Sequence, residues 1–397
     1  MFITRRLTQK IKELGTQYPI LAITGPRQSG KTTLLREAFP EYRYITLEDP
    51  EVRQFAETDP RAFLDLYDQY VIFDEAQRAP LLFSYMQGRV DESGLMGQFI
   101  LSGSQNFLLL KSITQSLAGR VALFKLLPFD FFELDQNQLL PDHFADAAIK
   151  GTYPAVYSRK ISPQVYYDNY IQTYIEKDVT ELINIKNFSS FKTFLKLCAN
   201  RAGQLLNISA LANEADIAFN TAKDWLSILE SSYIIFFLEP YYENRNKRLV
   251  KTPKVYFYDT GLLCFLLGIK DREELLLDRA KGSVFENMIV AEQLKRGYHL
   301  SVPRDLYFWQ DSNKNEIDLL WKENNTFQAM EIKATQTVTS ELFKQLDKFE
   351  AFIAPAPLRK MLMYGGAEDQ QRTNYTVLSW RRAADAEFGD KTTKFNT

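Results

Sequence analysis

Apolar and polar positions in the first third of the chain follow two spacings, one typical of helices and one of buried strands. Residues 2–18 carry Ile3, Leu7, Ile11 and Leu14 on one helical face, which predicts an amphipathic helix. Short apolar runs follow at residues 19–25, 42–48, 69–77, 97–105 and 119–129, and helical segments at 31–39, 51–67 and 81–90 separate most of them. Strands that alternate with helices in this way predict a doubly wound α/β domain with a parallel sheet.

The middle of the chain has helical spacing instead. Residues 164–183 and 188–203 are long segments whose aromatic and aliphatic stripes indicate helices packed into a core. Residues 207–242 then predict a short helix, a turn, a second helix and a hydrophobic hairpin around Tyr233–Tyr242. This order of elements is typical of a winged helix.

The last part of the chain, from about Arg248, returns to a mixture of strand and helix patterns. It predicts strands at residues 254–261, 306–311, 315–323, 326–335 and 360–366, and helices at 282–297 and 340–352. We therefore expect an α/β protein of three domains, which cover residues 1–135, 136–245 and 246–397. The middle domain is expected to be mainly helical.

The charge and the amino-acid composition of the chain exclude several classes of function. The chain has 48 basic and 50 acidic residues, so its net charge of −2 provides no general attraction to DNA or to anionic lipid. Contact with nucleic acid would require a local basic patch. Cys198 and Cys264 lie in apolar contexts without a CxxC pair, which excludes a disulfide framework and a cysteine zinc site. The two histidines, His143 and His299, are far apart in sequence, which argues against catalysis built on histidine.

The sequence also bears on location. The N-terminal segment carries charged residues every few positions, unlike a signal peptide. The longest apolar stretch, near residues 233–238, is far shorter than the roughly 20 residues that span a bilayer. We expect a cytoplasmic protein with no membrane role.

A glycine-rich motif follows the first predicted strand. Residues 25–32 satisfy GxxxxGK[ST] between a predicted strand and a predicted helix, which is the context that this phosphate-binding motif requires. The glycines let backbone amides turn toward the phosphates, and the helix that begins at Lys31 adds its positive dipole end. Lys31 is expected to reach the β- and γ-phosphates, and Thr32 to bind Mg²⁺. The predicted nucleotide-binding residues are Gly25, Pro26, Arg27, Gln28, Ser29, Gly30, Lys31, Thr32 and Thr33.

A pair of acidic residues ends a strongly apolar strand farther along the chain. Residues 70–73 are apolar, and Asp74 and Glu75 follow them directly. Asp74 is expected to hold the Mg²⁺ shell, and Glu75 to polarise the attacking water as a general base. Together with the phosphate loop, this pair predicts nucleotide hydrolysis rather than binding alone.

Two further residues are candidates for contact with the γ-phosphate. Ser104 follows the next parallel strand and is the preferred sensor, with Ser102 as the alternative. Arg120 is a candidate arginine finger or sensor, acting in cis or in trans. The alternative is that Arg120 is a surface arginine in an exposed turn.

These segments together resemble a known family. GPRQSGKTTLL, YVIFDEAQ, LSGSQ and SLAGRV are similar to the AAA+ P-loop ATPases of the prokaryotic family that carries a conserved C-terminal domain of unknown function. EKDV, LE-x-x-Y-I and KVYFYDTGL extend the resemblance over nearly the whole chain. The resemblance implies ATP as nucleotide, Mg²⁺ as cofactor, and a homo-oligomer, since AAA+ proteins commonly form rings with arginine fingers supplied in trans. Gln105 departs from the family pattern, in which Asn or Ser is common.

The C-terminal part contains a second candidate site. Asp318 and Glu331 are spaced as on two neighbouring strands of a hairpin, and Glu331 and Lys333 share a strand face. With Glu286 on the preceding helix, they are similar to the PD-(D/E)XK nuclease superfamily, which implies a restriction-endonuclease-like domain with Mg²⁺ held by Asp318 and Glu331. The alternatives are an inactive, scaffold-like domain and a simple Glu331–Lys333 salt bridge.

The sequence leaves two classes of function open for the process that ATP hydrolysis would drive. Residues 241–254 hold five basic residues against one acid, with two tyrosines, and favour DNA. The predicted recognition helix carries Lys223 but also Asp224 and Glu230, and this acidic content is unfavourable for contacts with bases in a major groove. The first hypothesis is therefore an ATP-dependent enzyme that cuts DNA. The second is a signalling or scaffold ATPase whose C-terminal domain binds a protein partner.

Overall fold

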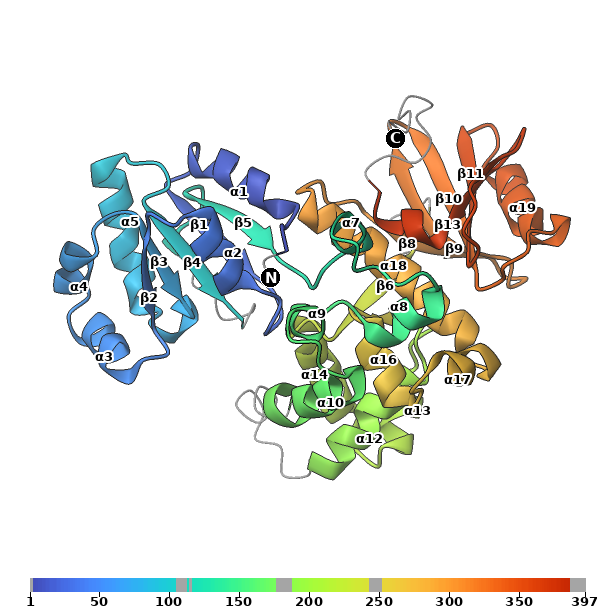
Figure 1. Ribbon diagram of the computed structural model, residues 1–397, viewed down its shortest axis with the longest axis horizontal. Coiled ribbons are helices and arrows are strands. Elements are labelled where there is room, and N and C mark those ends of the chain that lie inside the picture. The colour runs from blue at the N-terminus through green and yellow to red at the C-terminus, as the bar shows by residue number, and fades with distance from the viewer. Residues whose placement is uncertain (1–2, 105–112, 114–115, 176–187, 243–251, 386–397) are drawn as a thin grey trace. The chain divides into compact units, whose positions relative to one another are not determined.

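The computed structural model describes residues 3–104, 113, 116–175, 188–242 and 252–385. The chain divides into two compact units (Figure 1). The first unit comprises Met1–Phe129 and two short later segments, Ser231–Tyr233 and Tyr298–Val302; the second comprises Asp130–Glu230, Ile234–Gly297 and Pro303–Thr397. The division into three domains at residues 135 and 245 stays a prediction.

Five parallel strands form the sheet of the first unit, in the order β2-β3-β4-β1-β5. They are β1 (Ile20–Thr24), β2 (Arg43–Thr46), β3 (Val71–Asp74), β4 (Phe99–Gly103) and β5 (Val121–Lys125). Strands of a parallel sheet are buried on both faces, which explains why most of them appear in the sequence as continuous apolar runs. The predicted α/β fold with a parallel sheet is confirmed.

Helices cover both faces of this sheet (Figure 1). Leu21 and Ile23 of β1 point to the face that α1 (Leu7–Gly15) and α2 (Lys31–Ala38) cover. Ile20 and Ala22 point to the opposite face, because side chains alternate along a strand. The helices of that second face are α3 (Pro50–Thr58), α4 (Pro60–Leu66) and α5 (Leu81–Ser93), and a short 3₁₀ turn, η1 (Ala76–Arg78), follows β3.

Two helical predictions in this unit need correction. The first helix begins at Leu7 instead of residue 2 and ends at Gly15. The segment 51–67 is two helices rather than one, because Asp59 ends α3 and caps α4 by accepting a hydrogen bond from the Ala62 amide at 3.1 Å. Pro60 starts the second helix, at the first helical position where proline costs no hydrogen bond.

The second unit begins with a series of mostly short helices. They are α7 (Phe131–Gln136), α8 (Phe144–Lys150), α9 (Pro154–Ser158), α10 (Pro163–Tyr170) with the π-helical turn η2 (Ile171–Ile175), α12 (Phe188–Ala199), α13 (Ile208–Glu214) and α14 (Phe219–Ser231). Helices α16 (Thr260–Leu267), α17 (Arg272–Leu277) and α18 (Lys281–His299) follow later in the chain. The remainder of the long helix predicted from residue 164, including the EKDV segment, lies outside the described residues.

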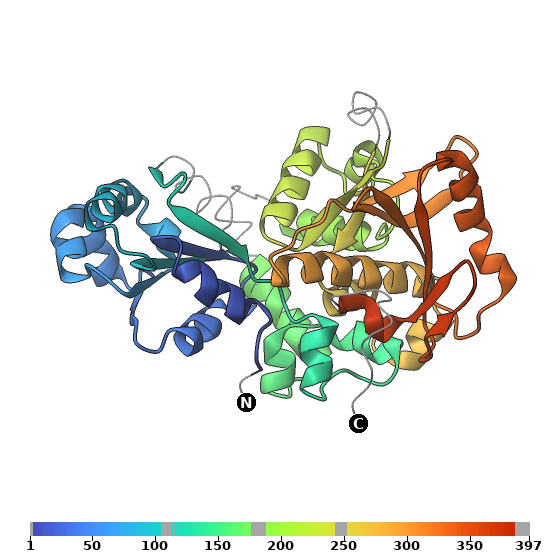
Figure 2. The same ribbon diagram turned by 90° about the horizontal axis from the view of Figure 1, so that it is seen from above.

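An eight-stranded mixed sheet forms the rest of the second unit, in the order β12-β13-β11-β10-β9-β8-β6-β7. Its strands are β6 (Ile235–Pro240), β7 (Lys254–Phe257), β8 (Tyr307–Gln310), β9 (Glu316–Glu323), β10 (Thr326–Lys333), β11 (Leu358–Tyr364), β12 (Gln370–Gln371) and β13 (Thr376–Ser379). The remaining helices are α19 (Lys344–Ile353) and two 3₁₀ turns, η3 (Ser340–Phe343) and η4 (Trp380–Ala384). Figure 2 shows this sheet and its helices from above.

The hydrophobic hairpin predicted around Tyr233–Tyr242 is a single strand. β6 pairs antiparallel with β7 on one side and parallel with β8 on the other. It is therefore an interior strand of the large sheet, and its antiparallel partner β7 is the next described strand of the chain after α13, α14 and β6 itself. The nearly continuous burial of β6 explains the apolar run that suggested a hairpin. The winged helix stays a prediction.

A buried polar network ties α18 to the start of the second unit. Glu292 accepts a hydrogen bond from the Phe131 amide at 2.7 Å and pairs with Lys295 at 2.8 Å. Lys295 also donates to Thr152, whose amide and hydroxyl both donate to Asp259. Buried charges require such partners, so this network fixes α8, α16 and α18 to one another.

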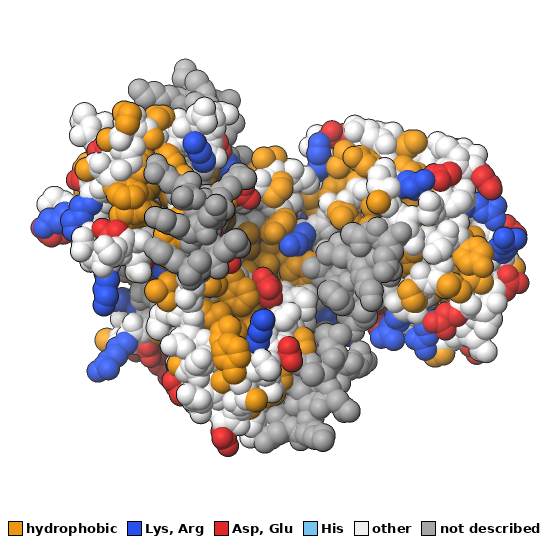
Figure 3. All heavy atoms as spheres, turned by 180° about the vertical axis from the view of Figure 1, so that it is seen from behind, with side chains coloured by type: hydrophobic (Ala, Val, Ile, Leu, Met, Phe, Trp, Pro, Cys, Tyr) orange, Lys and Arg blue, Asp and Glu red, His pale blue; other side chains and the backbone are white. Residues whose placement is uncertain are grey.

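Surface charge is mixed on the one face that Figure 3 draws. On the face drawn in Figure 3, acidic and basic side chains lie interspersed and not gathered by sign. Every described helix is too short or too polar to traverse a lipid bilayer.

Candidate functional site

The loop between β1 and α2 has a backbone that only glycine tolerates at its start. Gly25 has φ +152°, and a Cβ there would lie 2.0 Å from the Leu126 carbonyl oxygen. Gln28 and Gly30 also have positive φ, of 61° and 95°. Backbone that alternates in this way turns successive amides toward one side and forms an anion-binding nest at the beginning of α2.

The side chains of this loop carry both charge and unused hydrogen-bonding capacity. Lys31 is buried, and its Nζ donates to the carbonyl oxygens of Gly25 and Pro26, both at 2.9 Å. The hydroxyl of Ser29 is buried and has no hydrogen-bond partner among the described residues. A buried polar atom without a partner is costly unless a ligand supplies one, so the loop suits a phosphate-bearing ligand.

Asp74, the last residue of β3, accepts hydrogen bonds from four parts of the unit. The Thr32 hydroxyl donates to Oδ2 at 2.8 Å, and so does the Tyr44 hydroxyl at 2.6 Å. The Ser102 hydroxyl and the Glu75 amide donate to Oδ1. The structure thus brings together the threonine and the aspartate that were predicted to share a magnesium ion.

Glu75 follows in the left-handed region, with φ 53° and ψ 43°. Its Oε2 accepts hydrogen bonds from the side chains of Gln77 and Ser104. Two serines at the end of β4 therefore divide between the two acids: Ser102, within the strand, donates to Asp74, and Ser104, directly after it, donates to Glu75. Gln105, the next residue, lies outside the described residues.

Arg120 is not brought to the phosphate loop of its own chain. β5 begins at Val121, which pairs with Ile20 at the start of β1, whereas the phosphate loop follows Thr24 at the end of β1. Arg120 therefore lies at the amino ends of the parallel strands and the loop at the carboxyl ends. Its guanidinium makes two hydrogen bonds to Asp91, at 2.6 and 2.7 Å.

Two residues of this site were missed in the sequence. Tyr44 on β2 reaches Asp74, and no local motif indicates it, because its partner lies 30 positions away. Arg5 donates to the carbonyl oxygens of Ser29 and Leu127, at 2.8 and 2.6 Å, and is itself buried. It joins the phosphate loop to the chain that follows β5.

The C-terminal candidate residues also come together. Lys333 Nζ lies 2.9 Å from Asp318 Oδ2 and 2.7 Å from Glu331 Oε2. Asp318 also accepts a hydrogen bond from the Ile332 amide at 2.8 Å, which joins the two strands at this point. Glu286, on α18, offers a carboxylate oxygen within 4.8 Å of those of Asp318 and Glu316. Asp318, Glu331, Lys333 and Glu286 thus form one cluster, as their order in the sequence predicted.

Three members of this cluster were not predicted. Lys254, the first residue of β7, donates to Glu286 at 3.1 Å and to Glu316 at 2.6 Å. The Tyr256 hydroxyl donates to Glu286 at 2.6 Å. Lys254 lies at the end of the basic segment 241–254, of which residues 243–251 are outside the described part of the chain.

The cluster concentrates negative charge in a buried place. Burial, and after it the Asp318 carboxylate, raises the pKa of Glu286 to about 7 and that of Glu331 to about 8. Glu331 Oε1 is buried and has no hydrogen-bond partner among the described residues. Oxygen donors of this kind are the ligands that Mg²⁺ and Mn²⁺ prefer, so the residues present fit a hard divalent cation.

Comparison with known families agrees with the first of these sites. Residues 17–135 match a family described as an AAA domain. Residues 141–273 match the domain of unknown function DUF8612, and residues 281–382 match the domain of unknown function DUF4143. With the nest, Lys31 and Asp74 in place, the first unit is a P-loop ATPase domain of the AAA class.

Two relatives extend the similarity over most of the chain. The uncharacterized protein Rv2008c of Mycobacterium tuberculosis is 30% identical over 344 residues, which cover 85% of this chain and 75% of that protein. The uncharacterized protein MJ1544 of Methanocaldococcus jannaschii is 23% identical over 369 residues, which cover 81% and 79%. The chain belongs to the family of Rv2008c.

Solved structures resemble the chain only distantly. The Walker-type ATPase PABY2304 of Pyrococcus abyssi has 16% identity and a TM-score of 0.45, over 67% of this chain and 96% of that one. AMPPCP-bound DnaA from Aquifex aeolicus has 16% identity and a TM-score of 0.28, over 56% and 85%. Neither likeness assigns a function.

We predict that Gly25→Ala weakens nucleotide binding by at least about tenfold, because the new Cβ collides with a backbone carbonyl and the nest must open. Titration with a fluorescent ATP analogue measures the change. Gly94→Ala is the matched control: Gly94 has φ +62° but open space around it, so that variant loses some stability and keeps its affinity. Wild-type affinity in a folded Gly25→Ala protein would contradict the nest.

Proposed function

We propose that this protein is a Mg²⁺-dependent ATPase whose nucleotide cycle switches a metal-dependent nuclease site in its C-terminal part, with DNA as the substrate. The observation that carries the proposal is the convergence of Glu286, Asp318, Glu331 and Lys333 in a chain that also has an AAA domain.

The phosphate site has a residue for each task of ATP hydrolysis. Lys31 binds the β- and γ-phosphates, and the nest formed by the loop between β1 and α2 holds their oxygens. Thr32 and Asp74, already joined by a hydrogen bond, hold the magnesium ion, which neutralises charge on the phosphates when bound. Glu75 takes a proton from the attacking water as general base.

Ser104 connects the state of the nucleotide to Glu75. Its hydroxyl donates to Glu75 at 3.1 Å, and Gln77 donates to the same oxygen. A γ-phosphate oxygen that competes for the Ser104 hydroxyl weakens this hold on Glu75 and leaves the carboxylate able to turn toward the water. Arg120 belongs to a different step: since it lies at the amino ends of the strands, we propose that it serves a neighbouring copy in trans.

The nuclease site uses its lysine and its acids in separate roles. Asp318 and Glu331 would hold the metal ion, with Glu286 as a further carboxylate near Asp318, and a divalent cation would supply stabilisation of negative charge on the phosphodiester. Lys333, whose side chain is 37% exposed, contacts both acids and faces solvent, so it positions the attacking water. Asp318 is held for its role by the Ile332 amide.

A charge count supports a single cation in this cluster. Four carboxylates, on Glu286, Glu316, Asp318 and Glu331, face two ammonium groups, on Lys254 and Lys333. A metal ion binds the deprotonated acids, and with all six groups ionised the sum is −2. One divalent cation balances that charge, which a buried site otherwise tolerates poorly.

Chain continuity offers a route from the ATPase site to the nuclease site. The Tyr233 hydroxyl lies 2.9 Å from the hydroxyl of Thr24, which directly precedes the phosphate loop. Tyr233 is followed by β6, and β6 pairs with β7, which carries Lys254 and Tyr256. We propose that a movement of the phosphate loop passes through Tyr233 to these two residues and so to Glu286.

The second candidate is a signalling or scaffold ATPase whose C-terminal part is inactive and binds a protein partner. Lys254 favours it, because its ammonium group already occupies the space between Glu286 and Glu316. A winged-helix function for α13 and α14 belongs to either candidate, since these helices can contact DNA or protein.

We predict that Glu75→Gln slows ATP turnover by at least about 100-fold and leaves the affinity for a fluorescent ATP analogue nearly unchanged, because only the base is removed. Lys31→Ala is expected to lose both affinity and turnover. Glu57→Gln, which removes an exposed carboxylate of α3, is the matched control and keeps both. A Lys31→Ala protein that hydrolyses ATP at the wild-type rate would refute the assignment.

We predict that the full chain cuts plasmid and single-stranded DNA in Mg²⁺ or Mn²⁺, and that Asp318→Asn lowers the rate at least about 100-fold, because it removes a metal ligand. Calorimetry with Mn²⁺ is expected to show a matching loss of metal affinity. Glu368→Gln, which removes an exposed carboxylate, is the control. Metal binding without cleavage of either DNA by the wild type would favour the scaffold function instead.

A further inference from the structure

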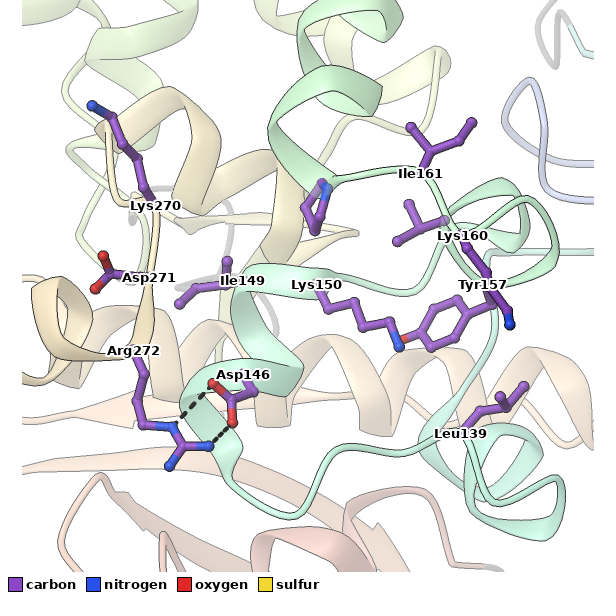
Figure 4. Close-up of a pocket in the computed structure, with 12 residues that line it drawn as sticks. Leu139, Asp146, Ile149, Lys150, Tyr157, Lys160, Ile161, Lys270, Asp271 and Arg272 are labelled. Carbon is purple, nitrogen blue, oxygen red and sulfur yellow. Dashed lines mark hydrogen bonds and ion pairs between the residues drawn. The ribbon is translucent and has the colours of Figure 1, made fainter.

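A cavity of about 580 Å³ lies in the second unit, apart from the residues of the two candidate sites (Figure 4). Its walls come from α8, from α9 and the segment that leads to the start of α10, and from the residues at the start of α17. This volume is within the range of roughly 300–1,000 Å³ that is usual for small-molecule pockets. The cavity falls within the region that matches DUF8612.

Part of the wall is apolar. Ile149 and Val156 line the cavity and are otherwise almost fully buried, with 8% and 2% of their surface exposed. Leu139, Ile161 and Pro163 extend this wall. A ligand with a hydrocarbon or aromatic body gains free energy when it covers such side chains.

Lys150, the last residue of α8, supplies a cation beside this wall. Its Nζ lies 4.2 Å from the centre of the Tyr157 ring, and Tyr157 is fixed by a hydrogen bond from its hydroxyl to the Gly151 carbonyl oxygen at 2.6 Å. In the described part of the chain, Lys150 has no carboxylate partner. Burial lowers its pKa, since desolvation disfavours an ammonium group without an anion beside it.

The remaining charges of the cavity leave it positive. Arg272 and Asp146 form an ion pair with two contacts, drawn as dashed lines in Figure 4. Asp271 caps α17 by accepting a hydrogen bond from the Glu274 amide at 2.9 Å. Lys160 and Lys270 are exposed at the cavity. Four cations and two acids line it, so the sum of the formal charges is +2.

We propose that this cavity binds a small organic phosphate, with its apolar body against Ile149 and Val156 and its phosphate group on Lys150. Lysine ammonium groups bind phosphate oxygens as point charges, and a phosphate dianion matches the formal charge of +2 around the cavity better than a carboxylate monoanion does. The arginine of this cavity is already engaged with Asp146. Lys160 and Lys270 supply the further positive charge that a dianion needs.

The probe for this site is 1-naphthyl phosphate, which combines an aromatic body with a dianionic group. Calorimetry is done on the full chain with Lys31→Ala, so that the phosphate loop does not bind the probe. Inorganic phosphate and 1-naphthol are titrated for comparison, because the first lacks the aromatic body and the second lacks the phosphate group. Saturable binding of 1-naphthyl phosphate is expected, with each of the two comparison compounds at least about tenfold weaker.

Variants of the lysines locate the binding. Lys150→Gln is expected to weaken 1-naphthyl phosphate at least about tenfold, since a hydrogen bond to a charged group is lost. Lys270→Gln, on the exposed edge, is expected to weaken it by a smaller factor of about two to five without a risk to folding. Lys344→Gln, an exposed lysine of α19 away from the lining residues, is the control and keeps the affinity.

Three results would overturn the proposal. One is the absence of saturable binding of 1-naphthyl phosphate up to about 5 mM, a concentration that detects even weak complexes. The second is equal affinity for 1-naphthol, which would mean that only the apolar wall is used. The third is an unchanged affinity in both Lys150→Gln and Lys270→Gln.

Discussion

The carboxylate of Asp74 is the point on which the ATPase site depends. It accepts hydrogen bonds from Thr32 on α2, Tyr44 on β2 and Ser102 on β4, as well as from the amide that follows it. A buried carboxylate is stable only when such donors surround it, so its position fixes the edges of three strands and the first turn of a helix. The parallel sheet makes this possible, because the carboxyl ends of its strands meet at one edge.

Buried carboxylates organise the second unit as well, but with different partners. Hydroxyl groups and amides surround Asp74, whereas the acids near β9 and β10 face Lys254, Lys333 and a tyrosine. The first arrangement leaves an aspartate that is held in place, with the Thr32 hydroxyl among its donors. The second places four carboxyl groups against two ammonium groups, and burial together with the Asp318 carboxylate raises the pKa of Glu286 and of Glu331.

The features that could be predicted from the sequence are those that depend on a local pattern of residues. The phosphate loop, the apolar strand before Asp74 and the alternation of strands and helices depend on residues close together in the chain, and the sheet they predict is confirmed. Contacts between distant residues carry no such pattern: Arg5 with Ser29, Tyr44 with Asp74, and Lys254 with Glu286 were all missed.

Two interpretations of the sequence differ from the structure, one for the apolar segment that forms β6 and one for Arg120. β6 has an apolar sequence because it is an interior strand, and the same run suggested a hairpin of a winged helix. Arg120 directly precedes β5, and in a parallel sheet the residue before a strand lies at the amino ends, whereas the phosphate loop lies at the carboxyl ends. The order and strand context of Glu286, Asp318, Glu331 and Lys333 were sufficient to predict a cluster, although not its two additional partners on β7.

The most direct test of the account is the rate of DNA cleavage in Mg²⁺ with and without ATP, measured on the wild type and on Glu75→Gln side by side. The account predicts that ATP changes the wild-type rate severalfold and that Glu75→Gln, which binds ATP without hydrolysing it, holds the rate at one constant value. A wild-type rate that is the same with and without ATP would contradict the link between the two sites.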